Sequence, residues 1–140
     1  MNQENIETRV AQALDFHKQG FNCAQCVACA CADMVGLNQD EAFRLAEGFG
    51  GGMGGFSETC GAISGGVLLF GYANSGGMGE RTKAATYKLS KALVNGFRAA
   101  TGSTLCGDLK GLTGGPVLRS CDGCIEDALR LTIEVLESRS

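Results

Sequence analysis

The chain has 140 residues, of which 44% are hydrophobic and 19% charged, a composition typical of one folded domain rather than of a disordered segment. Its net charge is −3 and its lysines and arginines form no cluster, which argues against nucleic-acid binding and against a basic membrane-binding patch. The first residues are polar and acidic, and no apolar run approaches the roughly 20 residues of a membrane span. We therefore expect a single domain over residues 1–140, located in the cytoplasm and not inserted in a membrane.

Helical periodicity is evident from the start of the chain. Apolar side chains at helical spacing predict a first helix over residues 6–20. A second helix is expected over residues 22–35, with Asn22 as its N-cap and Gly36 as its stop. A third, short helix is expected over residues 38–47.

Glycine then dominates the sequence: six of the eight residues in 48–55 are glycine, a density that no stable helix tolerates. We expect a loop or an abrupt turn here. Residues 59–72 are apolar enough to form a buried central helix. Within it Gly61 and Gly65 lie four residues apart, as do Ala62 and Gly66, which lets another backbone approach closely.

Two more helices are expected, a long amphipathic one over residues 79–100 and a last one over the apolar stripe from Ile125 to Leu136. A loop over residues 111–116 precedes the last helix. Strand signatures are missing, because β-branched runs with strict alternation do not occur. The predicted fold is all-α, a bundle of five to six helices with a glycine-rich loop before a buried central helix.

The eight cysteines carry the functional information. They are arranged as two tight groups with two further residues between them: Cys23, Cys26, Cys29 and Cys31, then Cys60, then Cys106, then Cys121 and Cys124. An even number of cysteines indicates a disulfide framework, a metal or cluster site, or thiol redox chemistry. The reducing cytosol disfavours the first of these.

Two of the cysteines are best placed to be catalytic. Cys23 lies at the start of a predicted helix, where unpaired backbone N–H groups and the helix dipole favour the thiolate and lower the pKa. Cys60 follows the glycine-rich segment and opens the predicted central helix, so backbone N–H groups can point at its sulfur. Cys29 and Cys31 are flanked by alanines and are expected to be small core residues.

Several spaced motifs resemble one known family. They are the segment around Cys23, the glycines of residues 49–54, the stretch Cys60-Gly61-Ala62-Ile63-Ser64-Gly65, and finally Cys106 and Cys124. In this order they resemble the C_GCAxxG_C_C family of redox-active proteins over nearly the whole chain. The resemblance implies a site built from Cys23, Cys60, Cys106 and Cys124. We add Cys121 to the expected metal ligands because it forms a CxxC pair with Cys124, and we expect Gly51, Gly52 and Gly61 to bring the backbone against a bound cofactor.

Three functions remain open. The family is similar to the non-haem region of split-Soret cytochromes c, which implies an iron–sulfur cluster for electron transfer or sensing. The alternatives are a metal-free thiol–disulfide oxidoreductase, in which Cys23 or Cys60 attacks, and a zinc-stabilised binding module. Family members lie near transporter genes, which suggests a link to a membrane transporter. A redox partner protein is expected but not identified by the sequence, and a homodimer is open.

Overall fold

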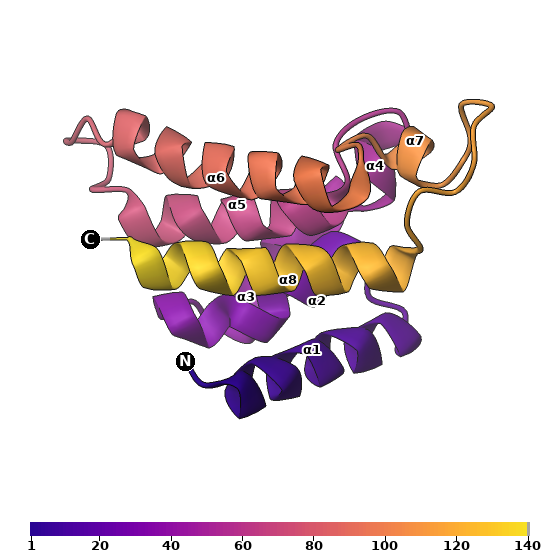
Figure 1. The fold of residues 1–140 in the computed structure, drawn as a ribbon. Coiled ribbons are helices and arrows are strands. Elements are labelled where there is room, and N and C mark those ends of the chain that lie inside the picture. Colours follow the sequence, from indigo (N-terminus) through magenta and orange to yellow (C-terminus); the bar gives the residue numbers. More distant parts are fainter. Residues whose placement is uncertain (140) are drawn as a thin grey trace.

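The computed structural model describes residues 1–139, and the prediction of an all-α fold is confirmed (Figure 1). Within these residues the only β-type pairing is an isolated bridge between Thr59 and Leu105. The longer helices are α1 (Gln3–Lys18), α2 (Cys23–Cys31), α3 (Gln39–Ala46), α5 (Gly61–Asn74), α6 (Lys83–Thr101) and α8 (Cys121–Ser138). The short elements are α4 (Gly50–Gly54), α7 (Cys106–Leu109) and two 3₁₀ turns, Ala32–Val35 and Glu47–Phe49.

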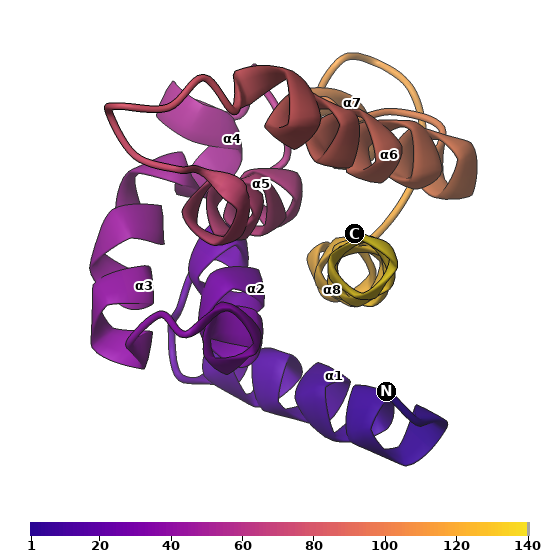
Figure 2. The ribbon, with the colours of Figure 1, turned by 90° about the vertical axis from the view of Figure 1, so that its left-hand side faces the viewer.

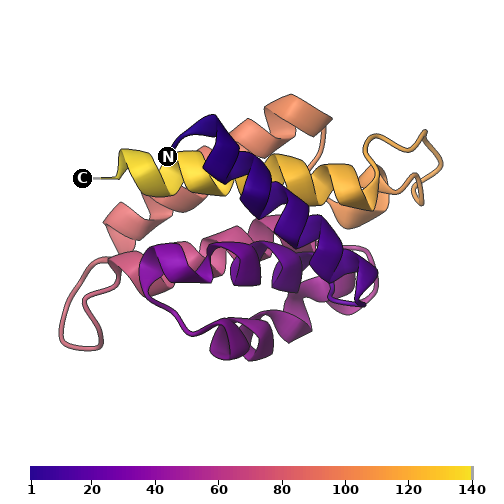
Figure 3. The same cartoon turned by 90° about the horizontal axis from the view of Figure 1, so that it is seen from below.

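The central helix is α5, as the sequence predicts. It packs against α2 on one side and against α6 and α8 on the other, while α1 covers α2 and α8 (Figures 2 and 3). Its largest buried side chains include Ile63, Leu69 and Phe70. None of the helices within residues 1–139 is long and apolar enough to cross a membrane.

The helix that carries Cys23 begins and ends as its sequence predicts. The side chain of Asn22 accepts a hydrogen bond from the backbone of Gln25, and the Gln25 side chain accepts one from the backbone of Asn22, which together form a capping box. The stop lies at Gly36, which has the left-handed conformation (φ 73°). The one difference is that the predicted helix tightens into a 3₁₀ turn at Ala32.

The glycine-rich segment forms a left-handed turn, so the expectation of a loop or abrupt turn is confirmed. In α4, Gly51, Gly52 and Met53 have φ values of 62°, 59° and 55°, the mirror image of ordinary helical backbone. Two of the three are glycines, which adopt this region without steric cost. The turn reverses the chain just before α5.

The close backbone approach predicted for α5 occurs at Gly65. A Cβ atom added to Gly65 would lie 2.4 Å from the carbonyl oxygen of Ala24, in the first turn of α2. The two helices therefore touch through their backbones. This contact places the start of α2, with Cys23, beside the start of α5, with Cys60 and Gly61.

Candidate functional site

Five cysteines line one small cavity at a single end of the bundle, and they share a structural feature. Each lies at a helix N-terminus: Cys23 opens α2, Cys60 caps α5, Cys106 opens α7, and Cys121 and Cys124 lie in the first turn of α8. Figure 1 shows α4, α7 and the start of α8 at this end. Helix N-termini carry unpaired N–H groups and positive dipole ends, which suit sulfur atoms with negative charge. We call this the cysteine cavity and define it by these five residues.

The structure thus brings together all five cysteines that we expected to be metal ligands. Cys60, Cys106 and Cys124 are each 4% exposed, whereas Cys23 and Cys121 are half-buried. All eight cysteines, which lie within the described residues, are free thiols. Whether the five bind a metal stays a prediction.

The thiols in the cysteine cavity form a chain of contacts. Hydrogen bonds join Cys60 to Cys23 and Cys60 to Cys124, so Cys60 lies in the middle. This central position agrees with the expectation that Cys60 is one of the two chemically important cysteines. It also makes Cys60 the residue whose removal disturbs the most sulfur contacts.

The expectation that Cys23 has a lowered pKa is wrong for the thiol form of the site. The hydrogen bond to Cys60, burial and the charge of Cys60 raise the pKa of Cys23 well above its ordinary value. The backbone N–H groups of Gly51 and of Cys23 itself act in the opposite direction, as a helix N-terminus should, but they are outweighed. The sequence indicates the helix N-terminus, which lowers the pKa of Cys23, but it does not indicate the contact with the sulfur of Cys60, which raises it.

Cys60 behaves similarly. Its hydrogen bond to Cys124 is the largest influence and raises the pKa, and with burial and the charge of Cys124 it brings the pKa of Cys60 to about 12, although Cys23 and the backbone N–H of Ala62 lower it. Burial likewise raises the pKa of Cys106, although Lys110 opposes the change. Without a partner cation, these thiols hold their protons at neutral pH.

The three glycines that we expected to approach a cofactor lie close to the cysteine cavity. The backbone of Gly51 forms a hydrogen bond to the Cys23 sulfur. A Cβ atom on Gly52 would lie 2.4 Å from Cβ of Cys106, and one on Gly61 would lie 3.0 Å from Sγ of Cys23. Gly52 and Gly61 therefore have no room for a side chain, because Cys106 and Cys23 occupy that space, whereas a Cβ atom on Gly51 would only touch Phe56 (3.6 Å). A direct role in binding a cofactor stays a prediction.

Two segments far apart in the sequence, residues 58–60 and 104–106, pair through their backbones beside the cavity. The N–H of Cys60 donates to the carbonyl of Thr104 (2.8 Å), and the N–H of Cys106 donates to the carbonyl of Glu58 (2.8 Å). These bonds flank the bridge between Thr59 and Leu105. They fix Cys60 against Cys106, which opens α7, a short helix that the sequence analysis did not predict.

Two cationic side chains at the cavity were also missed. Lys110 and Arg119 line it together with the cysteines. Arg119 forms two hydrogen bonds with the carboxylate of Asp127, at 2.9 Å and 3.1 Å. Lys110 lies over the ring of Phe56, with Nζ 4.8 Å from the ring centroid. No spacing in the sequence links these residues to the cysteines, because the loop that holds them has no periodic pattern.

Cys26, Cys29 and Cys31 lie outside the cysteine cavity, in the core. The expectation that Cys29 and Cys31 are core residues is confirmed, since they are 2% and 0% exposed. Cys29 donates a weak hydrogen bond from its thiol to the carbonyl of Gln39 (3.6 Å). Burial raises the pKa of Cys29 to about 11 and that of Cys31 to about 12, so both are poor nucleophiles.

Replacing Asn22 by Ala should loosen the start of α2 and expose Cys23. Asn22 caps α2 and also donates to the carbonyl of Glu47 (2.9 Å), so we expect a loss of about 1–2 kcal/mol in urea unfolding and faster alkylation of Cys23, measured by mass spectrometry. Asn38→Ala is the matched control, because Asn38 caps α3 without touching the cavity. Equal alkylation of Cys23 in both variants would contradict this role.

The cavity is small. Its volume is about 20 Å³, which is room for about one water molecule. Within residues 1–139, no three His, Cys, Asp or Glu side chains have the spacing that holds a metal ion. The donors are assembled, but in this thiol state they are packed against one another.

Comparison with known families gives one match. The sequence model of the family described as "Putative redox-active protein (C_GCAxxG_C_C)" matches residues 21–135, a stretch that includes all eight cysteines. Comparisons with curated proteins and with solved structures give no significant match.

Proposed function

Because the chain belongs to the C_GCAxxG_C_C family of redox-active proteins, we propose that the cysteine cavity is its redox centre and that it binds an iron–sulfur cluster. The observation that carries the proposal is the convergence of five thiols from four helices on one cavity, with only Leu109, Lys110 and Arg119 completing its wall. A structural core does not need five cysteines at helix N-termini. Iron–sulfur clusters are held by cysteine thiolates.

The donor set fits such a cluster chemically. Cys23 and Cys60 receive hydrogen bonds from the backbone N–H groups of Gly51 and Ala62, and such bonds to sulfur tune cluster potentials. Gly52 and Gly61 let the backbone come close to Cys106 and Cys23. The raised pKa values of Cys23, Cys60 and Cys106 also mean that their thiolates need a bound cation, which the iron of a cluster supplies.

The residues that would hold the cluster are Cys23, Cys60, Cys106 and Cys124, with Cys121 as a fifth donor at the rim. When bound, a cluster supplies one-electron chemistry. The protein's own contribution is to hold the sulfurs at helix ends, exclude water and place Lys110 and Arg119 at the edge. Since the thiols enclose a volume of about 20 Å³, they must separate before a cluster can enter.

A metal-free thiol–disulfide function is the second candidate, and a specific contact favours it. Cys60 is hydrogen-bonded to both Cys23 and Cys124, so its sulfur is near two resolving partners. The raised pKa values of Cys23 and Cys60 oppose it, because the attacking species is the thiolate.

The deciding experiment is iron and acid-labile sulfide analysis, with a visible spectrum, on protein purified without oxygen. We expect iron and sulfide in matching amounts and broad visible absorption. A colourless protein free of iron and sulfide, both as purified and after reconstitution, would contradict the cluster. Stoichiometric zinc would support the binding module instead, and rapid alkylation of one or two thiols would support the thiol–disulfide function.

A further inference from the structure

Lys110 is held beside the cysteine cavity by contacts on three sides. Its backbone N–H donates to the carbonyl of Cys106 (3.0 Å), which fixes the residue next to the site. Its ammonium lies over the ring of Phe56. On its other side it lines the cavity that Cys121 also lines, and although burial lowers its pKa, Cys121 raises it. The backbone bond fixes where the side chain begins, and the contact with Phe56 defines where the ammonium lies.

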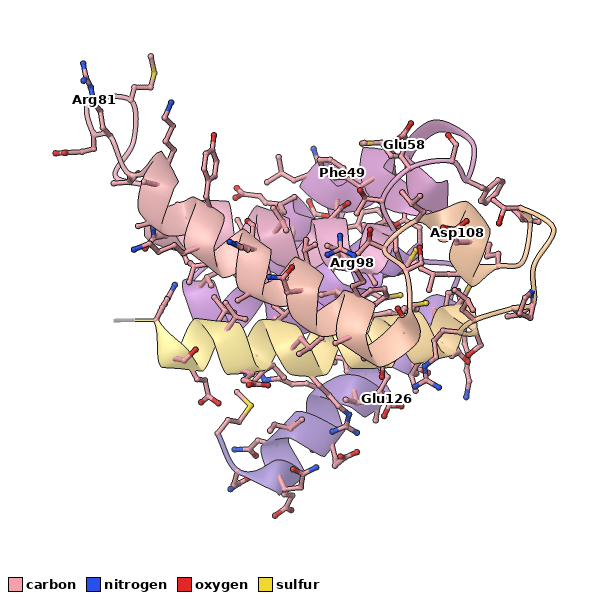
Figure 4. All side chains as sticks on the ribbon, turned by 45° about the horizontal axis from the view of Figure 1, so that its top comes forward. Phe49, Glu58, Arg81, Arg98, Asp108 and Glu126 are labelled. Atoms are coloured by element: carbon pink, nitrogen blue, oxygen red, sulfur yellow. The ribbon has the colours of Figure 1, made fainter. Side chains whose placement is uncertain are left out.

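The charge of Lys110 is not compensated by an acidic partner. No ion pair joins it to a carboxylate within residues 1–139. The nearby carboxylate of Asp108 accepts hydrogen bonds from the hydroxyls of Ser103 (3.0 Å) and Thr113 (2.9 Å). Figure 4 shows Asp108 and Glu58 at this end of the molecule. Arg119, the other cation at the cavity, is paired with Asp127.

The ammonium of a lysine is positively charged at neutral pH. Lys110 lines the cavity together with Cys23, Cys106 and Cys121.

We propose that Lys110 is a positioning residue whose ammonium, fixed over Phe56 at the rim of the cysteine cavity, raises the reduction potential of the redox centre. This inference rests on the proposed redox function and on the proposed cluster. Reduction adds one electron from an external donor to a cluster and makes the site more negative, and a fixed positive charge stabilises that state. Reduction of a disulfide here would also take up two protons, because the released thiols have raised pKa values, and would leave the charge of the site unchanged.

The test compares reduction potentials of Lys110→Met and the unchanged protein in an anaerobic titration at low salt. The titration follows visible absorbance. We expect a lower potential for Lys110→Met, equivalent to about a two- to fivefold smaller equilibrium constant for reduction. The difference should shrink as salt is added, because Lys110 is only half-buried.

Two control variants separate charge from other effects. Lys110→Arg keeps the charge and should keep the potential. Lys83→Met removes the same charge at the start of α6, near Arg81 at the opposite end of the molecule (Figure 4), and should also leave it unchanged. Thermal unfolding of each variant checks that the fold is intact.

The inference is overturned if Lys110→Met titrates like the unchanged protein, or if Lys110→Arg shows the same drop. If the protein without any substitution shows no redox transition, both the proposed function and this inference are overturned. A normal transition in all variants overturns the inference alone.

Discussion

Replacing Gly65 by Ala should destabilise the protein by about 3 kcal/mol or more, a large part of the 5–15 kcal/mol that holds a typical domain together. The new methyl group would lie 2.4 Å from the carbonyl oxygen of Ala24 and 3.1 Å from its carbonyl carbon. These are backbone atoms in a helix, so they cannot rotate away as a flexible side chain would. The helices α2 and α5 must separate, and the start of α2 with Cys23 must move with them.

Gly71→Ala is the matched control on the same helix. A Cβ atom there meets no atom within 4 Å, so the substitution should stabilise α5 by about 0.5–1 kcal/mol through its better helix propensity. Urea unfolding of both variants measures the two effects with opposite signs. If Gly65→Ala were as stable as the unchanged protein, the close contact of α2 with α5 would be wrong.

The close approach at Gly65 shows what the sequence could predict. The spacing of small residues in 61–66 indicates that another backbone comes near, but it does not say which one, because the partner carbonyl of Ala24 is some forty residues earlier in the chain. The helix boundaries followed from local signals such as the capping residue Asn22 and the left-handed Gly36.

The candidate site could be predicted in part. The resemblance selected Cys23, Cys60, Cys106 and Cys124, and the structure gathers these around one cavity together with Cys121. The backbone pairing of residues 58–60 with residues 104–106 could not be predicted, since it joins two irregular segments without periodicity. The pKa of Cys23 was misjudged for a related reason: the helix N-terminus is local in sequence, whereas the sulfur of Cys60 that outweighs it is a tertiary contact.

The second large effect concerns Cys60. Under the cluster hypothesis, Cys60→Ser should lower the iron bound per protein, because a serine hydroxyl replaces a central thiolate ligand. Substituting even an indirect neighbour of a metal typically costs 10- to 100-fold in affinity, so we expect a loss of at least about tenfold. The measurement is iron and sulfide content after anaerobic purification, with the visible spectrum of each variant.

Cys29→Ser is the control that makes this result interpretable. Both variants exchange one buried thiol for a hydroxyl, but Cys29 lies outside the cavity, and its replacement can donate to the carbonyl of Gln39 as the thiol does. Its iron content should therefore equal that of the unchanged protein, while thermal unfolding shows that both variants remain folded. If Cys60→Ser kept its iron, Cys60 would not be a ligand; if both variants lost it equally, the loss would come from the core. A loss of iron in Cys60→Ser but not in Cys29→Ser would show that the cofactor depends on the cysteines of the cavity and not simply on the number of cysteines in the chain.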